Sequence, residues 1–370
     1  MQRLPYLDAL RSFAMIFGVF LHASVLREGW DHEVLSFLSA RFRMPLFFLI
    51  SGFFAAMLLT RRGSGPFVRW RLVVLGVPLV FGLVVLNPLA FYFIDKFNGG
   101  TAGLFDIVTG AAEARAKPTQ VWHLHLWFLI SLSVYVLAAP VLMWVLNLSI
   151  ITRCLHWLAD RRTGLCVVIL AAMVAIWEVL VRGAWSALSL AEVLPGAQFL
   201  VTITLIYAFY FALGMAAFYV RDLFEALHRW ALVWLALGIV GGLALGMVAD
   251  TLPSPVAVIL QIGFRTLSTV AFIMVLMAAF RAFIPAQSRV AYVMNTTIYT
   301  VYLLHYLVIY LLAVTVFGGV TNPYILHLLT ALTALGIGIA VHFGLVQNSR
   351  VASFLLNGTS QPRKAVAKPA

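Results

Sequence analysis

The stretch that decides the fold is RSFAMIFGVFLH, Arg11 to His22, in which two polar side chains bound a run of mostly apolar residues. An α-helix turns ~100° per residue, so these eleven steps turn ~1,100° and rise ~16 Å. Arg11 and His22 are therefore expected on one helix face, separated by about half the thickness of a bilayer core. A charge that faces lipid costs ~2.5–3.5 kcal/mol on insertion scales, so this face is predicted to look into the protein or into water. A simpler interpretation pairs Arg11 with Asp8 one turn earlier and lets a neighbouring helix satisfy His22.

The composition of the whole chain extends this interpretation to a membrane protein. The chain has 370 residues, of which 63% are hydrophobic and 10% charged, and its mean hydropathy is +1.01. These values exclude an ordinary soluble domain. About ten apolar runs are long enough to cross a bilayer: roughly 4–26, 43–60, 72–94, 121–147, 164–182, 198–220, 230–249, 256–280, 290–316 and 323–347.

The predicted fold class is all-α, a polytopic transmembrane helix bundle of about ten spans. A β-barrel is not expected, because barrel strands need only ~10 residues of alternating polarity and these runs are uniformly apolar. The polar breaks are too short for a second folded domain, so we expect one transmembrane domain over residues 1–350. The chain from Asn357 onward is polar and contains proline, and residues 351–370 are predicted to form a disordered cytoplasmic tail.

The charge distribution predicts the orientation of the chain. The net charge is +12, which in a soluble protein would suggest a nucleic-acid partner. Here the basic residues concentrate in the loops on one side of the predicted spans, and most acidic residues fall on the other side. Because cytoplasmic loops of membrane proteins are enriched in lysine and arginine, both termini are predicted to be cytoplasmic. The basic character then requires no nucleic acid.

Four polar residues from four different predicted spans map to the outer half of the membrane, which suggests a polar chamber open to the exterior. These residues are His22, Ser51, His125 and His305. Ser51 is followed by Gly52, and a Ser-Gly pair equally suits close helix packing. Trp127 and His125 also suit an interfacial belt. No metal motif such as HExxH or CxxC is present, and no metal site is predicted.

A buried neutral histidine can act as a general base. Removing the proton from a sugar hydroxyl as it attacks contributes ~10²–10⁴ in rate. Ser51 could serve as a nucleophile only with a histidine within reach, which the sequence does not show.

Several motifs in register resemble the membrane acyltransferase-3 family, and they extend over nearly the whole chain. Arg11, ten intervening residues and His22 reproduce its R-X10-H signature. FFLISGFF (residues 47–54) resembles its second-helix motif, and RWRLVVLGVP (residues 69–78) resembles the basic segment that follows. YLDALRSF, FRMPLFFLISGFF, HLWFL and the late YLLH are similar to the osmoregulated periplasmic glucan biosynthesis protein C group. HLWFLISL replaces the acidic WSLSxE-type element of many O-antigen acetylating relatives, which favours the glucan-modifying branch.

The resemblance implies a multi-pass protein of the bacterial inner membrane that transfers a succinyl or similar acyl group from cytoplasmic acyl-CoA to hydroxyls of periplasmic glucans. His22 corresponds to the catalytic histidine and Arg11 to its motif partner. No permanently bound cofactor is expected, since succinyl-CoA or another acyl-CoA is a donor substrate. The expected partners are this donor, the glucan acceptor and the bilayer, and a glucan synthase or a second copy of the chain remain open as protein partners.

The remaining candidate residues are assigned by charge and position. A succinyl carboxylate in a low-dielectric cavity requires a cation, for which Arg43 at the outer mouth is favoured over Arg11 and Arg265. Supporting positions near the acceptor are Ser51, His125, Trp127 and His305. The CoA phosphates are assigned to Arg61, Arg62, Arg69 and Arg71, although positive-inside anchoring explains these four arginines equally well.

Three alternative functions remain open at this point. The chain could acetylate another extracytoplasmic glycan, or it could transport a glycan or anion without making bonds. Inverted repeats and broken helices, which many transporters have, are not evident in the sequence. The third alternative is a scaffold for a glucan synthase, which predicts that His22→Ala leaves glucan modification intact.

Overall fold

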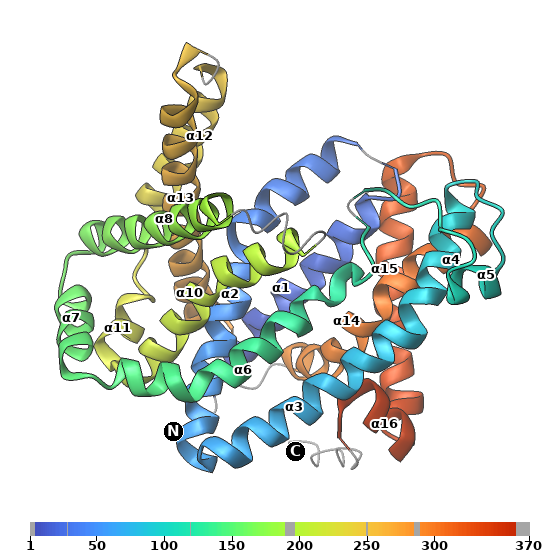
Figure 1. Ribbon diagram of the computed structural model, residues 1–370, viewed down its shortest axis with the longest axis horizontal. Coiled ribbons are helices and arrows are strands. Elements are labelled where there is room, and N and C mark those ends of the chain that lie inside the picture. The colour runs from blue at the N-terminus through green and yellow to red at the C-terminus, as the bar shows by residue number, and fades with distance from the viewer. Residues whose placement is uncertain are drawn as a thin grey trace. The chain divides into compact units, whose positions relative to one another are not determined.

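The computed structural model describes residues 4–27, 29–118, 120–188, 197–248, 251–284 and 289–359. In this part of the chain the regular elements are all helical, as Figure 1 shows. Nine helices there are long and apolar enough to cross a membrane, and a further apolar helix, Leu232–Val248, is shorter. The predicted fold class is therefore confirmed. The orientation of the termini stays a prediction.

The chain divides into two compact units. The first unit comprises Met1–Ala14, Ala40–Ser64 and Leu137–Ser288, and the second comprises Met15–Ser39, Gly65–Val136 and Arg289–Ala370. Helices α1 (Pro5–Ser24), α2 (Trp30–Arg62) and α6 (Trp127–Leu146) are divided between the two units, and α3 (Ser64–Phe81) has only its first residue in the first unit.

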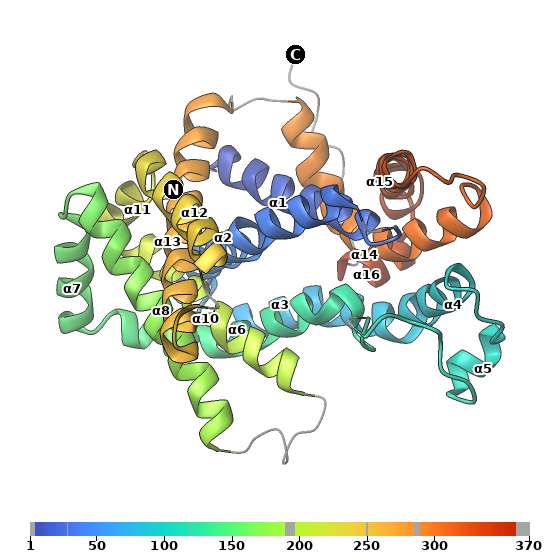
Figure 2. The ribbon, with the colours of Figure 1, turned by 90° about the horizontal axis from the view of Figure 1, so that it is seen from above.

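In its described residues the first unit also has six helices of its own. They are α7 (Ser149–Ala159), α8 (Thr163–Ala187), α10 (Gln198–Tyr219), α11 (Arg221–Ala226), α12 (Leu232–Val248) and α13 (Ser254–Phe283). Helices α12 and α13 pack along each other, and α8 packs against both α13 and α10. Figures 1 and 2 both show α12 and α13 side by side.

Close helix approach explains the Ser-Gly pair in α2. A Cβ atom built on Gly52 would lie 2.0 Å from the Phe211 carbonyl oxygen, and one built on Gly214 would lie 1.8 Å from the Leu49 carbonyl oxygen. Helices α2 and α10 therefore touch backbone to backbone, and only glycine permits this distance. Ser51 is buried beside this contact. The packing interpretation of the Ser-Gly pair is thus observed.

The second unit is built around α14 (Arg289–Thr315), which packs against α4 (Asn87–Phe97) and α15 (Pro323–Val341). Its other elements are α3 (Ser64–Phe81), η1 (Gly82–Leu86), α5 (Leu104–Thr109), η2 (Leu124–Leu126), η4 (His342–Val346) and α16 (Arg350–Asn357). Their apolar core gathers around α14 and includes Ile309, Ile94, Ala331 and Val19.

The first residues of the predicted tail are helical and not disordered. Residues 350–357 form α16, which packs against α14 and η4. Ser349 caps its first turn by accepting a hydrogen bond from the Ala352 backbone N–H at 3.2 Å. Gly358 ends the helix with φ +63°, and a Cβ atom built on it would lie 2.5 Å from the Val74 Cα. A glycine is required there because other residues rarely adopt this conformation. Residues 360–370 lie outside the described part of the chain.

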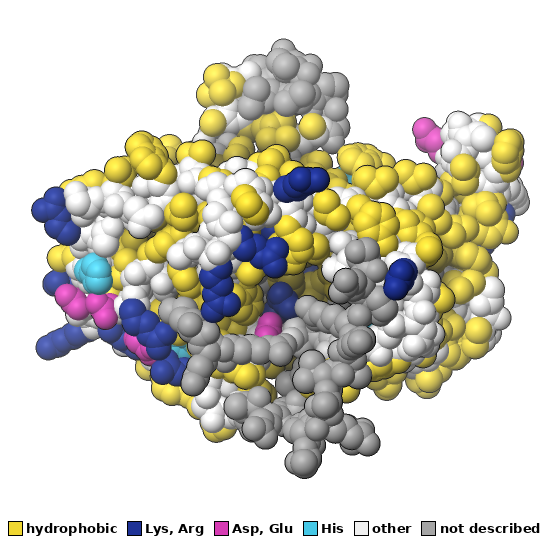
Figure 3. All heavy atoms as spheres, turned by 90° about the horizontal axis from the view of Figure 1, so that it is seen from below, with side chains coloured by type: hydrophobic (Ala, Val, Ile, Leu, Met, Phe, Trp, Pro, Cys, Tyr) yellow, Lys and Arg dark blue, Asp and Glu magenta, His cyan; other side chains and the backbone are white. Residues whose placement is uncertain are grey.

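Hydrophobic side chains cover much of the surface, with arginine and lysine side chains set among them, as Figure 3 shows for one face. Large apolar residues that are more than half exposed include Val80, Trp144, Ile176, Val240 and Ile259, all on membrane-length or apolar helices. A soluble protein rarely exposes so much contiguous apolar surface, whereas lipid tails solvate it without cost. The chain is a multi-pass membrane protein.

Candidate active site

Three histidines meet in the second unit, at positions contributed by α1, η2 and α14. The ring centroids of His22 and His305 lie 5.3 Å apart, those of His125 and His305 lie 4.8 Å apart, and those of His22 and His125 lie 6.5 Å apart. His125 and His305 are buried, whereas His22 is half-buried. We call these residues, together with Tyr302, Tyr306, Tyr310 and Gln120, the histidine–tyrosine cluster.

Helix α14 supplies one side of this cluster by its periodicity. Tyr302, His305, Tyr306 and Tyr310 are spaced so that one helix face carries all four side chains. The Tyr306 ring stacks on the His125 ring with centroids 5.3 Å apart and lies 5.2 Å from the His22 ring. The tyrosines were not among the predicted site residues. Tyr302, Tyr306 and Tyr310 follow one another at intervals of four positions on the helix face that carries His305, and this spacing is the signal that would have identified them.

Hydrogen bonds in the cluster set the tautomer of His305 and anchor the turn that carries His125. The Nδ1–H of His305 donates to the Tyr302 carbonyl oxygen at 2.6 Å, because a carbonyl can only accept. In the neutral ring the lone pair is therefore on Nε2. The Tyr302 hydroxyl donates to the His125 carbonyl oxygen at 2.8 Å, which holds the turn that carries His125.

Gln120 connects two of the tyrosines. Its amide nitrogen donates to the Tyr306 hydroxyl at 3.2 Å and to the Tyr310 hydroxyl at 2.6 Å. Its amide oxygen accepts from the Lys117 backbone N–H at 2.8 Å. The loop before η2 is thereby attached to α14 through buried polar groups, which cost free energy unless they are paired.

His125 sits on a distorted turn and not on the helix that the sequence suggested. The predicted span over 121–147 begins at Trp127 in α6, and Leu124–Leu126 form the 3₁₀ turn η2. The residue before His125, Leu124, is buried with φ +45°, a conformation that non-glycine residues rarely adopt. Such strain persists only where surrounding contacts enforce it, and it is concentrated at functional sites.

A π turn in the preceding helical segment packs against η2 and helps to hold the strained backbone at Leu124. In a regular α-helix the ring of Pro88 would clash with the carbonyl group of Val84, four residues earlier. The π turn Gly82–Leu86 lies at this position. A Cβ atom on Gly82 would lie 2.7 Å from the Leu126 side chain, so η2 packs directly on this turn. Asn87, which follows it, donates to the Trp122 carbonyl oxygen at 2.9 Å.

Neighbouring residues of the second unit were predicted in part. Trp127 begins α6 directly after η2 and is half-buried. His123 is buried, and its Nδ1–H donates to the Leu124 carbonyl oxygen at 3.0 Å. Burial lowers the pKa of His123, and this hydrogen bond opposes the effect only in part.

Two predicted arginines lie on α3. Arg69 is exposed, while Arg71 is partly buried with its guanidinium 5.7 Å from the Trp70 ring centre.

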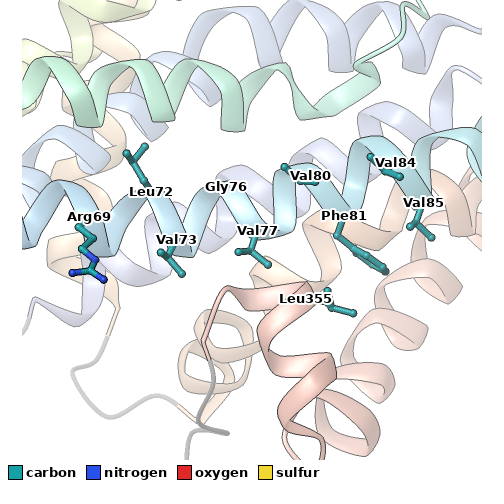
Figure 4. A pocket seen from close by; sticks show the side chains of 10 residues that line it. All are labelled: Arg69, Leu72, Val73, Gly76, Val77, Val80, Phe81, Val84, Val85 and Leu355. Carbon is teal, nitrogen blue, oxygen red and sulfur yellow. The ribbon is translucent and has the colours of Figure 1, made fainter.

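Arg69 lies at one end of a groove of about 710 Å³ on the second unit. The groove runs along α3 and η1 and is otherwise lined by apolar side chains, with Leu355 of α16 on its far side (Figure 4). Its valines, such as Val80 and Val84, are exposed. An apolar surface of this kind on a membrane-length helix is what lipid tails cover.

The other predicted residues belong to the first unit. Arg11 lies 3.6 Å from Asp8, and its guanidinium is 5.8 Å from the Phe54 ring centre, so the pairing with Asp8 is observed. Arg43 is half-buried on α2. Arg61 and Arg62 are exposed at the end of α2. Arg265 is ion-paired with Glu178. Among the described residues, no group of three His, Cys, Asp or Glu side chains is arranged to hold a metal ion.

The comparisons with known proteins agree with the motif resemblance. The acyltransferase-3 family, described as an acyltransferase domain, has a model that matches residues 4–344. The chain belongs to this family. Its similar curated relatives include glucans biosynthesis protein C of Shigella dysenteriae serotype 1 (strain Sd197), 29% identical over 147 residues, and that of Escherichia coli (strain K12 / DH10B), 28% identical over 146 residues.

Both matches cover 36% of this chain and 37% of the relative's own length. No solved structure matches the chain. In this chain the R-X10-H motif lies on α1. Its histidine, His22, is the most exposed member of the histidine–tyrosine cluster.

Proposed function

We propose that the chain is a transmembrane O-acyltransferase that moves a succinyl or similar acyl group from cytoplasmic acyl-CoA to hydroxyls of periplasmic glucans. The observation that carries the proposal is the convergence of His125, His305 and Tyr306 on the half-buried ring of His22. Membership of the acyltransferase-3 family supports the reaction class. The names of the glucan biosynthesis relatives support the acceptor.

In this proposal His22 is the general base. Its imidazole removes the proton of a glucan hydroxyl as the hydroxyl oxygen forms a bond to the thioester carbonyl carbon. The resulting tetrahedral intermediate collapses with cleavage of the C–S bond, and the departing thiolate takes up the proton that His22 holds. Ester and free CoA thiol are formed, and His22 returns to its neutral state.

The neighbouring rings would position this base. His305 is held in one orientation by its bond to the Tyr302 carbonyl oxygen, and His125 is stacked on Tyr306. A base held by packed neighbours needs little reorganisation to reach the reacting hydroxyl, and such orientation contributes much of an enzyme's rate. A neutral imidazole is also the form that a low-dielectric surrounding favours.

The other predicted residues take supporting roles in the proposal. Arg43 would bind the carboxylate of a succinyl group by a charge-assisted hydrogen bond. Arg61, Arg62 and Arg69 are exposed and Arg71 is partly buried, and their charges would suit the phosphates of acyl-CoA on the predicted cytoplasmic side. Ser51 is buried in close helix packing, so we propose direct transfer to the acceptor without a covalent acyl-enzyme.

The test measures release of free CoA thiol by purified protein supplied with succinyl-CoA and a glucan. We expect His22→Ala to lower the rate ~10²–10⁴-fold, the usual contribution of a general base. The matched control is His156→Ala, because His156 is an exposed histidine of α7 paired with Asp222, and this variant should retain the rate. Unchanged thiol release in His22→Ala would contradict the proposal, and no release by the wild type would favour a transporter or scaffold.

Two further measurements separate the finer parts. Mass spectrometry of periplasmic glucans with and without the protein identifies the acyl group, and an increment other than succinyl would remove the succinyl assignment alone. A covalent succinyl adduct that accumulates without acceptor would refute direct transfer.

A further inference from the structure

A second polar site occupies the first unit, in a cavity of about 460 Å³ among α2, α8, α12 and α13. Its polar lining consists of Arg41 from α2, Glu178 and Arg182 from α8, and Gln261 and Arg265 from α13. We call this site the arginine–glutamate cavity. Figures 1 and 2 show α8 close to α13, in agreement with their packing.

The cavity carries an excess of positive charge. Glu178 is 3% exposed, and its two carboxylate oxygens each take one arginine: Oε1 accepts from Arg182 Nε at 2.8 Å, and Oε2 pairs with Arg265. Arg41 adds a third guanidinium, close enough to Arg265 for the two charges to repel. Among the described residues that line the cavity, three are arginines and one is a glutamate, so this lining carries a formal charge of about +2.

The pairing with Glu178 leaves hydrogen-bond donors for a ligand. A guanidinium has five N–H donors. Arg182 and Arg265 each pair with a single oxygen of Glu178, which occupies only some of these donors. The buried carboxylate also holds Arg182 and Arg265 in place, so their forks are ordered before a ligand arrives. Arginine forks bind carboxylate and phosphate oxygens in pairs, with short and strong hydrogen bonds.

The lining of the cavity also has apolar members. Val258 and Ile262 of α13 line the cavity together with two glycines of α12, Gly242 and Gly246. Of the described residues, none outside the helix backbone has an atom within 4 Å of a Cβ built on Gly246, so the cavity lining leaves space at that position. Its volume falls in the range of ~300–1,000 Å³ that is usual for ligand sites.

We propose that the arginine–glutamate cavity binds an oxyanion, a phosphate or carboxylate group, carried on an apolar body. The arginines take the oxyanion, and the apolar body lies along Val258, Ile262 and the open space beside Gly246. Two sources supply this chemistry, an anionic phospholipid of the bilayer and a soluble organic acid or phosphate. This binding requires no bond to be made, so it goes beyond the proposed acyl transfer and stands independently of it.

The experiment measures the midpoint of thermal unfolding of the full-length protein in a neutral detergent. Phosphatidylglycerol is added in one arm, phosphatidylcholine in a second, and succinate or inorganic phosphate at matched ionic strength in a third. We expect a saturable rise with phosphatidylglycerol and none with phosphatidylcholine, because ligand that binds only the folded state stabilises it. A saturable rise with the soluble anions instead assigns the site to that source.

Two variants locate the binding. Gly246→Leu fills the cavity and should abolish the rise, whereas Gly263→Leu is the matched control: it also has open space around its Cβ but does not line the cavity. Arg41→Gln should weaken the apparent affinity about tenfold, the factor that corresponds to ~1.4 kcal/mol. The proposal is overturned if no anion raises the midpoint, or if Gly246→Leu responds as the wild type does.

Discussion

The histidine–tyrosine cluster of the second unit and the arginine–glutamate cavity of the first keep polar groups inside membrane-length helices in two different ways. In the cluster, ionisable rings can remain neutral, and their hydrogen bonds go to backbone carbonyls, hydroxyls and one amide. In the cavity, charges are retained and are held by a buried carboxylate between two arginines. A neutral network suits a base that must accept a proton, whereas a network with excess charge suits the capture of an anion.

The largest expected effect tests whether the cluster works as a unit. His305→Ala removes the ring that lies 5.3 Å from His22 and 4.8 Å from His125. Loss of this support should lower kcat by up to ~10²-fold, because small displacements of a catalytic group cost rate steeply. KM for acyl-CoA should change little. Steady-state thiol release checks this, and a variant with normal kcat would show that His22 acts without its neighbour.

The next effect compares two glutamates that each bridge two arginines. Glu178 is buried, whereas Glu225 bridges Arg221 and Arg281 at the surface with its side chain 39% exposed. Glu178→Gln should lower the free energy of unfolding by roughly 1–3 kcal/mol, since it removes the buried negative charge that pairs with Arg182 and with the partly buried Arg265.

Glu225→Gln is its control and should cost ~0–1 kcal/mol, as exposed ion pairs do. Denaturant unfolding in detergent measures both variants. Equal losses would mean that burial of Glu178 does not set the strength of its two pairs.

A smaller effect is expected from the hydroxyls of the cluster. Tyr310→Phe removes the acceptor of the 2.6 Å bond from Gln120, and Tyr306→Phe removes the acceptor of the longer bond at 3.2 Å. Each change should cost ~0.5–1.5 kcal/mol in stability, with the larger loss for Tyr310. Thermal unfolding of the two variants tests this order, and the reverse order would assign the stronger bond to Tyr306.

The smallest expected effect is a pH dependence of stability that arises from His228, a residue of the first unit outside the membrane-length helices. His228 donates from Nδ1 to the Phe224 carbonyl oxygen and accepts from the Tyr6 hydroxyl at 2.9 Å. Burial lowers its pKa, the Phe224 hydrogen bond and Glu225 oppose this, and Arg281 and Arg221 add to it. The unfolded chain therefore binds the proton more readily, and stability is lost as pH falls below about 6.5.

Thermal unfolding between pH 7.5 and 5.5 should show this decrease in the wild type and a weaker one in His228→Gln. Glu225 does not titrate in this pH range. Burial raises its pKa, but the hydrogen bond and charge of Arg281 lower the pKa by more, so the net pKa lies below its ordinary value and below pH 5.5. His156→Gln, at an exposed site, should retain the decrease. The same slope in all three proteins would exclude His228 as its source.

The sequence allowed much of the fold to be predicted, because length and hydropathy are local properties. The predicted run 198–220 corresponds to α10, Gln198–Tyr219, almost residue for residue. The prediction was less accurate where helices continue beyond the apolar core: the run 43–60 is only part of α2, Trp30–Arg62. Local turns were also missed, since the π turn before Pro88 and the 3₁₀ turn at His125 depend on packing.

The candidate site could be predicted in part. His22, His125 and His305 were grouped by their depth, and the structure places them together. Ser51 was grouped with them by the same argument, yet it lies in the close packing of α2 in the first unit. Depth follows from the position along a helix, whereas contact depends on which face each helix turns towards its neighbour.

The sequence by itself determined that this chain enters a membrane, how many apolar helices it forms and which motif places a histidine on the first of them. These features follow from hydropathy and helix geometry, which act within about twenty residues. Only the tertiary structure decided that Tyr306 stacks on His125 and that Glu178 lies between two arginines. The Tyr306–His125 and Glu178–Arg265 contacts join residues more than eighty positions apart in the chain. They depend on the packing of whole helices, which no local pattern records.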